Sequence, residues 1–280
     1  MDKVIVFGAT TSAMYVYEKI VIDYDIIAFA DNDVKKQNTQ LMGKPVIPPN
    51  TIENYEINQI IIVSLSSANV IKKQLIDMGI PEYKINISYI ENSINARKQF
   101  LIDFSKIVYQ RDLEGSVAEA GVFQGEYAKY INKAFPDRKL YLFDTFEGFD
   151  KKDTDIEKIN GFSDAQEGYL NITSQDIVMQ KMQYPKNCVI KKGYFPESAN
   201  GIDDKFVFVN LDLDLYMPTK NGLRYFYEKM TKGGIIIIHD YFSDGYYGVN
   251  KAVDEFIDEY NGEIYSFPIG DGISIAIQKL

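Results

Sequence analysis

The chain has 280 residues, about twice the ~150 of a typical domain, so two domains or one large domain is expected. Hydrophobic residues make up 46% and charged residues 25% of it, which excludes a disordered chain. Its net charge of −10 argues against a nucleic-acid or anionic-membrane surface, because phosphate binding needs clustered lysine and arginine. The one cysteine, Cys188, excludes an intrachain disulfide and a CxxC zinc site and fits a reducing cytoplasm.

The N-terminal residues, 1–8, indicate a strand and a turn, without the basic stretch and apolar run of a secretory signal. The longest aliphatic runs, Ile60–Val63 and Ile235–Ile238, have the length of a strand and fall well short of the ~20 apolar residues of a membrane-spanning helix. We therefore expect a cytoplasmic protein with no membrane and no nucleic-acid partner.

Strand and helix patterns alternate through the first third of the chain, which favours a parallel sheet. We expect a Rossmann-like domain over residues 1–92 and a connecting helix over 93–110. The strands expected in the domain are residues 4–7, 26–30 and 60–65, and a helix cap is expected at Thr10–Ser12. The apolar side of the connecting helix is expected to consist of Ile94, Leu101, Phe104 and Val108.

Residues 111–280 indicate a second α/β domain. Its expected strands are 116–120, 140–144, 189–191, 206–213, 235–239, 263–267 and 273–278. The last two leave no room for a helix between them, so they should pair as an antiparallel hairpin. The expected fold is α/β with two Rossmann-like units, of which the C-terminal one has a class I methyltransferase-type sheet ending in that hairpin. The polar stretch 151–170 is a loop or a lid that orders on substrate binding.

The first candidate site is the turn EAGVFQG, residues 119–125, which follows an expected strand and opens a helix. Glycines let the backbone approach a ligand closely, and a helix N-terminus offers free N–H groups. Glu119 at the strand tip could take a positive ammonium group. An ordinary strand-to-helix turn is the alternative, because short glycine patterns are common.

The second candidate is Asp144, at the tip of the next strand about 20 residues on, where an acid can accept both hydroxyls of a ribose. Thr145 and Phe146 follow it, and the aromatic ring could face an adenine. An exposed loop acid is the alternative.

The third candidate combines Asp212, Asp214, His239 and Asp240. Residues two apart on a strand share a face, so Asp212 and Asp214 should point the same way, and like charges there are costly unless a cation or solvent compensates them. His239 and Asp240 should end the neighbouring strand, at the edge where open parallel sheets bind ligands. Asp212, His239 and Asp240 therefore predict a divalent-metal site, with a hydrogen-bonded histidine beside solvated acids as the alternative.

With these residues in view, the region from about 111 to 280 resembles the macrocin O-methyltransferase family, whose members are metal-dependent enzymes that use S-adenosylmethionine to methylate sugar hydroxyls. The stretches that carry the resemblance, in family order, are EAGVFQGEYA, LYLFDTFEGF, KKGYFPES, NLDLDLYMPT, GGIIIIHDY and GVNKAVDEF.

The resemblance implies a role for each candidate residue. The methionine part of the cofactor would lie along the turn that contains Glu119, Ala120, Gly121, Val122 and Gly125, and Asp144 would hold the ribose. Asp212 and Asp240 would ligate the metal, and Asp214 would be the general base. Where this sequence has His239–Asp240 the family commonly has two aspartates, and a histidine favours Mn²⁺ or Fe²⁺ over Mg²⁺ more than an all-carboxylate site would.

The expected activity is thus methyl transfer from S-adenosylmethionine to a sugar hydroxyl, on a nucleotide-activated sugar for a surface polysaccharide or a glycosylated metabolite. A catechol-type phenol is the rival acceptor. An NAD-dependent nucleotide-sugar oxidoreductase or epimerase is another alternative, although the turn after the first strand keeps only Gly8 of a GxGxxG pattern, with Asp31 at the second strand tip. A non-catalytic nucleotide-sugar-binding protein is the third. We expect a homo-oligomer, with the N-terminal domain as scaffold or oligomerisation unit.

Overall fold

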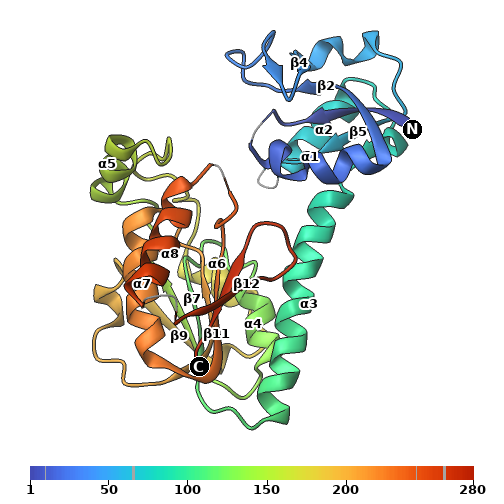
Figure 1. The fold of residues 1–280 in the computed structure, drawn as a ribbon. Coiled ribbons are helices and arrows are strands. Elements are labelled where there is room, and N and C mark those ends of the chain that lie inside the picture. The colour runs from blue at the N-terminus through green and yellow to red at the C-terminus, as the bar shows by residue number, and fades with distance from the viewer. Residues whose placement is uncertain (10, 65–66, 244, 261–262) are drawn as a thin grey trace. The chain divides into compact units, whose positions relative to one another are not determined.

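The computed structural model describes the chain except residues 10, 65–66, 244 and 261–262 (Figure 1). It divides into two compact units, Met1–Asn95 and Ala96–Leu280. Over the described residues, no helix combines the length and the apolar character needed to cross a membrane.

The first unit is a six-stranded sheet in the order β3-β4-β2-β1-β5-β6, parallel throughout except between β3 and β4. Helix α1 packs on one face through Ala13 and Ile20, and α2 packs on the other through Ile71 and Leu75. The elements are β1 (Asp2–Phe7), α1 (Thr11–Asp23), β2 (Tyr24–Ala30), β3 (Gln40–Leu41), β4 (Lys44–Ile47), β5 (Gln59–Ile62), α2 (Ala68–Asp77) and β6 (Ile85–Asn86). Two 3-10 turns, at Pro49–Asn54 and Glu82–Lys84, complete it.

Strand β5 ends at Ile62, three residues earlier than predicted, and Leu65 lies outside the described residues. Of the predicted helix cap, Thr10 and the side chains of Thr11 and Ser12 also lie outside them.

Helix α3 (Ser88–Gln110) begins five residues before the predicted start of the connecting helix. Its Leu101, Phe104 and Val108 are buried in the core of the second unit. Ile94 was predicted on the same apolar side but is 45% exposed. It precedes Ala96, where the second unit begins, so the packing that buries the other three does not extend to it.

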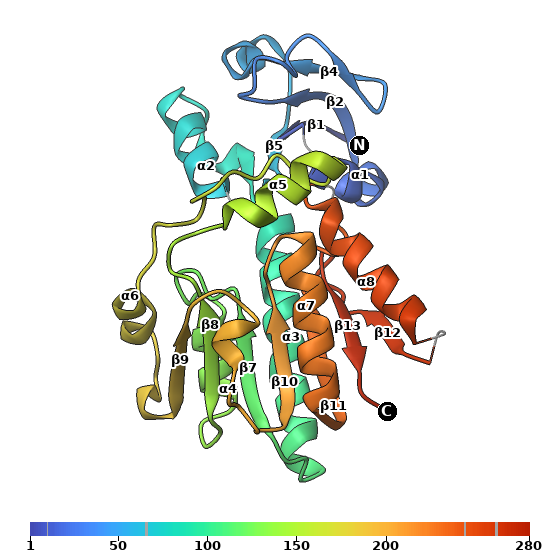
Figure 2. The same cartoon turned by 90° about the vertical axis from the view of Figure 1, so that its left-hand side faces the viewer.

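The second unit is built on a seven-stranded sheet in the order β12-β13-β11-β10-β7-β8-β9 (Figure 2). Strand β13 runs antiparallel to both β11 and β12, so the predicted closing hairpin and methyltransferase-type sheet are confirmed. The strands are β7 (Ser116–Ala120), β8 (Leu140–Asp144), β9 (Cys188–Lys192), β10 (Phe206–Leu211), β11 (Met230–Ile238), β12 (Tyr265–Pro268) and β13 (Ile275–Gln278).

Helices cover both faces of this sheet, with α7 and α8 on one and α3 and α4 on the other (Figure 1). Strand side chains alternate between two core clusters, so that Ala118 faces α7 and α8 whereas Val117 faces α3 and α4. Burial on both faces explains why these strands are almost continuously apolar. The helices are α4 (Ala128–Ala134), α5 (Lys151–Asn160), α6 (Gln175–Gln180), α7 (Tyr216–Lys229) and α8 (Tyr247–Glu259), with 3-10 turns at Pro185–Asn187 and Glu197–Ala199.

The segment 151–170, predicted as a loop or lid, begins with helix α5, which is fastened to α7 by a buried carboxylate. Glu157 is fully buried and accepts hydrogen bonds from the backbone N–H of Tyr216, at 2.8 Å, and from the Ser163 hydroxyl, at 2.7 Å. Because Tyr216 is the first residue of α7, this carboxylate satisfies one of the free N–H groups of the helix N-terminus. Glu157 thereby fixes the chain two residues after Asp214.

The segments that follow the parallel strands β7 and β10 lie so close together that only glycine fits at position 121. Gly121 has φ +85°, and a Cβ atom there would lie 1.7 Å from the carbonyl oxygen of Asp212. The Asp212 N–H donates to the Ala120 carbonyl between the same two strand ends, at 2.8 Å. The prediction that Gly121 lets a ligand approach the backbone stays a prediction; the structure adds that the backbone of Asp212 itself requires glycine here.

Gly121→Ala is therefore expected to lower the free energy of unfolding by about 3 kcal/mol or more, because the overlap is with backbone that cannot move aside. Gly161→Ala is the matched control, since Gly161 has φ +67° with open space around it and should cost only about 1–2 kcal/mol of left-handed strain. Urea unfolding measures both. Equal losses would contradict the close approach of the Asp212 backbone as the reason for Gly121.

Candidate functional site

Five acidic side chains gather where β7, β8, β10 and β11 reach their carboxyl ends. They are Glu119, Asp144, Asp212, Asp214 and Asp240, and Glu119 and Asp214 have pKa values raised by burial and by these neighbours. Among the described residues, Arg97 and His239 are the cations that pair with the cluster. The edge therefore carries an excess of negative charge, which a cationic ligand would relieve.

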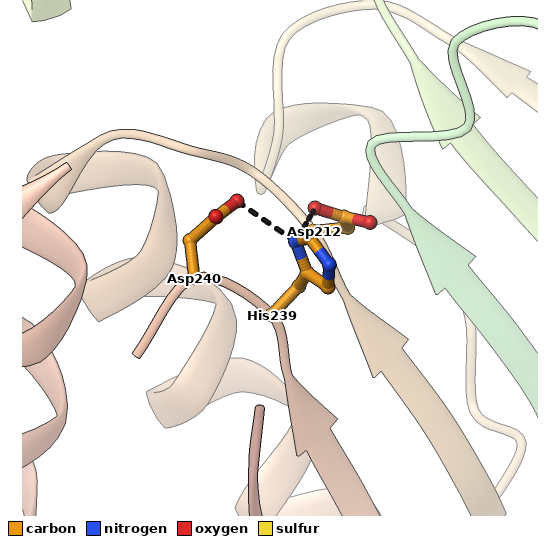
Figure 3. A group of neighbouring side chains, drawn as sticks. All are labelled: Asp212, His239 and Asp240. Atoms are coloured by element: carbon orange, nitrogen blue, oxygen red, sulfur yellow. Dashed lines mark hydrogen bonds and ion pairs between the residues drawn. The ribbon is translucent and has the colours of Figure 1, made fainter. Parts of the chain in front are cut away.

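Figure 3 shows the ring of His239 between the carboxylates of Asp212 and Asp240. Its Nδ1 lies 3.2 Å from Asp212 Oδ1 and 2.8 Å from Asp240 Oδ2. One ligand atom from each residue lies within 4.8 Å of the others. Burial alone would lower the pKa of His239, but the two carboxylates outweigh burial and raise it to about 10. The ring thus holds a proton at a place where positive charge is favoured.

This donor set fits a divalent metal. Two carboxylates and one imidazole supply oxygen and nitrogen ligands of the kind that Mn²⁺ and Fe²⁺ accept. A metal at this point would take over the charge that the proton on His239 provides, because the ring must be deprotonated to act as a ligand. The three residues predicted as ligands are therefore brought together by the fold.

Asp214 is also brought to this cluster, but not in the way predicted. Strand β10 ends at Leu211, so Asp212 and Asp214 do not share a strand face. Asp214 instead adopts the left-handed conformation, with φ +60°, in the turn before α7. It is half-buried, and its pKa is raised well above the ordinary value by loss of solvation and by Asp212 and Asp240.

Glu119 is 2% exposed at the end of β7. Its Oε1 accepts a hydrogen bond from Asn210 at 2.9 Å, whereas its Oε2 has no hydrogen-bond partner among the described residues. Burial raises the pKa of Glu119 to about 8, although the nearby Arg97 opposes this. A buried oxygen without a partner is rare in native structures, so this atom fits a ligand that brings a donor, such as the ammonium group of S-adenosylmethionine.

Asp144 ends β8 and is held by two backbone N–H groups, from Phe123 at 2.8 Å and from Phe146 at 2.7 Å. Each carboxylate oxygen receives one of these bonds and can accept another. The carboxylate is thus fixed in orientation with the capacity to take two hydroxyls.

The other predicted cofactor residues serve the turn and the core. Thr145 donates its hydroxyl to the Gly148 carbonyl at 3.0 Å, and Phe146 packs against the core on the α3 and α4 face. Ala120 and Val122 are buried, and Gly125 lies against Val178. Helix α4 begins only at Ala128, so the glycine turn 121–125 is not the helix N-terminus that was predicted.

The sequence analysis missed Arg97. Its Nη2 donates to Asn210 Oδ1 at 2.7 Å and to Asp212 Oδ2 at 3.1 Å, and its guanidinium lies over the Tyr127 ring, 4.1 Å from the centroid. Burial would lower the pKa of Arg97, but Asp212 raises it above the ordinary value, so the group is charged. The sequence spacing could have indicated it. Residue 97 lies on the same side of the helix as the buried Leu101 and Phe104, and a charged side chain there requires a buried partner.

Comparison with known families decides what this site belongs to. Residues 93–264 match the sequence model of the macrocin-O-methyltransferase (TylF) family, and residues 1–86 match a family described as C2185-like, N-terminal. The chain belongs to the macrocin O-methyltransferase family. It is therefore an S-adenosylmethionine-dependent O-methyltransferase of a sugar-methylating family.

Two solved structures, NovP and CalS11, agree with this chain at the level of the fold. The O-methyltransferase NovP matches with TM-score 0.53 and 20% identity, over 66% of this chain and 79% of NovP. CalS11, a calicheamicin methyltransferase, matches with TM-score 0.52 and 19% identity, over 76% of this chain and 91% of CalS11. The apo structure of CalS11, described as that of a TDP-rhamnose 3'-O-methyltransferase, matches with TM-score 0.44 and 18% identity. The match covers 76% of this chain and 93% of the other. No curated protein sequence matches the chain.

Because the pKa of Glu119 is raised, replacing its carboxyl group should change the stability of the protein in a pH-dependent way. The folded state holds the proton up to about pH 8 whereas the unfolded state releases it near the ordinary value, so stability falls as pH rises through this window. Glu119→Gln carries no such proton. We expect its melting temperature relative to the wild type to rise between about pH 6 and about pH 8.5, by differential scanning calorimetry.

Glu114→Gln, at an exposed position, is the control and should show no such trend. A Glu119→Gln difference that stays constant across this pH range would contradict the assignment of a buried, protonated carboxyl.

Proposed function

We propose that this enzyme transfers a methyl group from S-adenosylmethionine to a sugar hydroxyl beside a divalent metal, and that the acceptor is a nucleotide-activated sugar. The observation that carries the proposal is the cluster of Asp212, Asp214, His239 and Asp240, which lies at the same sheet edge as Glu119 and Asp144. The family supplies the methyl donor, and this cluster supplies a place for a metal and a base next to it.

The cofactor would be held by its two ends. Glu119 Oε2 would accept from the ammonium group, which supplies the missing donor and favours the ionised carboxylate. Asp144, already oriented by Phe123 and Phe146, would accept from the two ribose hydroxyls. S-adenosylmethionine brings the electrophilic methyl group, so the protein's task is to position the acceptor and to remove its proton.

Asp212, His239 and Asp240 would hold the metal. A bound divalent ion lowers the pKa of a hydroxyl that it coordinates and orients neighbouring oxygens of the acceptor. Asp212 Oδ1, His239 Nδ1 and Asp240 Oδ2 are the atoms that already converge, while Asp212 Oδ2 stays paired with Arg97.

Asp214 would accept the proton from the acceptor hydroxyl. Its raised pKa makes its carboxylate a stronger base than an exposed aspartate, and general-base catalysis typically contributes about 10²–10⁴ in rate. Glu157 supports this role, because its bond to the Tyr216 N–H fixes the turn that carries Asp214.

The metal site is compatible with a sugar acceptor. Neighbouring hydroxyls on a sugar can both approach one metal, as can those of a catechol, which stays the rival acceptor. In the first unit, Asp31 accepts N–H bonds from Ala9, in the turn after β1, and from Asp33, at 2.8 Å each, and pairs with Lys36 at 3.4 Å. The turn after β1 keeps only Gly8 of a GxGxxG pattern, which argues against a dinucleotide. We propose a scaffolding or oligomerising role for this unit, in a cytoplasmic homo-oligomer.

The proposal predicts methylated sugar when nucleotide-activated sugars are offered with S-adenosylmethionine and Mg²⁺, Mn²⁺ or anaerobic Fe²⁺, measured by mass spectrometry against a catechol panel. Asp214→Asn should lower kcat by about 10²–10⁴ without the base, yet bind S-adenosylhomocysteine like the wild type in calorimetry.

Asp258→Asn, an exposed acid on α8, serves as the control and should keep full activity. Full turnover in Asp214→Asn would assign the base elsewhere. Methylation of catechols alone would reject a sugar as the acceptor. Activity that a chelator does not change would reject the metal.

A further inference from the structure

Hydrogen bonds run without a break between the two halves of the site. Glu119 Oε1 accepts from Asn210 Nδ2, Asn210 Oδ1 accepts from Arg97, Arg97 donates to Asp212 Oδ2, and Asp212 Oδ1 faces His239. Arg97 stands in the middle of this chain and is the one member that comes from α3. Its head group contacts Asn210, Asp212 and Tyr127, so we consider its effect on the metal through Asp212.

Three contacts fix the Arg97 guanidinium. A single nitrogen, Nη2, bonds both Asn210 and Asp212, and the planar group lies on the Tyr127 ring. The Tyr127 hydroxyl also donates to the Arg97 carbonyl at 3.3 Å, so the same tyrosine holds the residue at its backbone and at its head. The side chain is 12% exposed, which shields these contacts from water.

The consequence for Asp212 is geometric. Arg97 occupies Oδ2, which leaves Oδ1 turned toward His239 Nδ1. A carboxylate held in this way offers one defined oxygen to a metal. Without the guanidinium, Asp212 could rotate, and its second oxygen would compete for the same ion. Partners that orient a metal ligand typically contribute 10–100-fold in metal affinity.

We propose that Arg97 is a positioning residue that orients the Asp212 carboxylate for the metal, an inference that rests on the proposed function of this site. Charge alone does not account for the arrangement, because an ammonium group would neutralise Asp212 equally well. What lysine lacks is the flat group that stacks on Tyr127 while bonding two acceptors in fixed directions. Arg97→Lys therefore separates orientation from charge.

The test is calorimetric titration of the full-length protein with Mn²⁺ and, separately, with S-adenosylhomocysteine. Arg97→Lys is expected to bind Mn²⁺ about 10–100-fold more weakly than the wild type. Its S-adenosylhomocysteine affinity, measured without metal, should stay within about threefold of the wild type, because the charge near Glu119 is retained. Lys98→Arg makes the reverse exchange one residue on, where the side chain lies over Tyr130, and should change neither affinity.

Tyr127→Leu is a second variant that keeps Arg97 and removes only the ring beneath it. It should weaken Mn²⁺ binding in the same direction by about threefold to tenfold, which corresponds to the loss of a buried cation–π contact. This variant tests the role of Arg97 in Mn²⁺ binding if Arg97→Lys fails to fold.

If Arg97→Lys binds Mn²⁺ as tightly as the wild type, the proposal is wrong. It is also wrong if the variant loses Mn²⁺ and S-adenosylhomocysteine binding in parallel and melts at a lower temperature, because that indicates a structural role only. A wild-type protein that binds S-adenosylhomocysteine but no Mn²⁺ would instead reject the proposed metal site itself.

Discussion

Carboxylates lie close together at the carboxyl ends of β7, β8, β10 and β11. The other features of the site follow from the electrostatic repulsion between them. Two unit charges about 4 Å apart interact by about 4 kcal/mol at the effective dielectric of a protein. Arg97 and His239 offset part of the repulsion, and Glu119 and Asp214 respond with raised pKa values. A cationic methyl donor and a divalent ion are the ligands that such an edge stabilises.

The scaffold that holds these groups is mostly backbone. Gly121 lets the Asp212 backbone lie against the end of β7. Glu157 fixes the start of α7 and with it the turn of Asp214. The N–H groups of Phe123 and Phe146 orient Asp144. Side chains that would contact ligands are thus held largely by backbone groups of neighbouring segments, as precise positioning requires.

Much of this was predictable from the sequence, because it depends on local patterns. Strands β7 and β8 have the predicted bounds, and the closing hairpin follows from the short spacing of the last two strands. The grouping of Asp212, His239 and Asp240 was predicted from their positions at strand ends, and the structure places them together.

What could not be predicted depends on contacts between distant residues. Asp214 reaches the cluster through a left-handed turn, which the alternation of a strand does not encode. The need for glycine at position 121 arises from the backbone of residue 212. Arg97 lies 115 residues before its partner Asp212 and on a helix whose pattern indicated only a connector.

The most direct test of the account is pulsed electron paramagnetic resonance on the Mn²⁺-loaded protein. The account predicts a ¹⁴N coupling to the metal from His239, the only histidine in the chain. His239→Asp should still bind Mn²⁺ through three carboxylates but lose the coupling. Bound Mn²⁺ without a ¹⁴N coupling in the wild type, or a coupling that persists in His239→Asp, would contradict a metal centre at Asp212, His239 and Asp240.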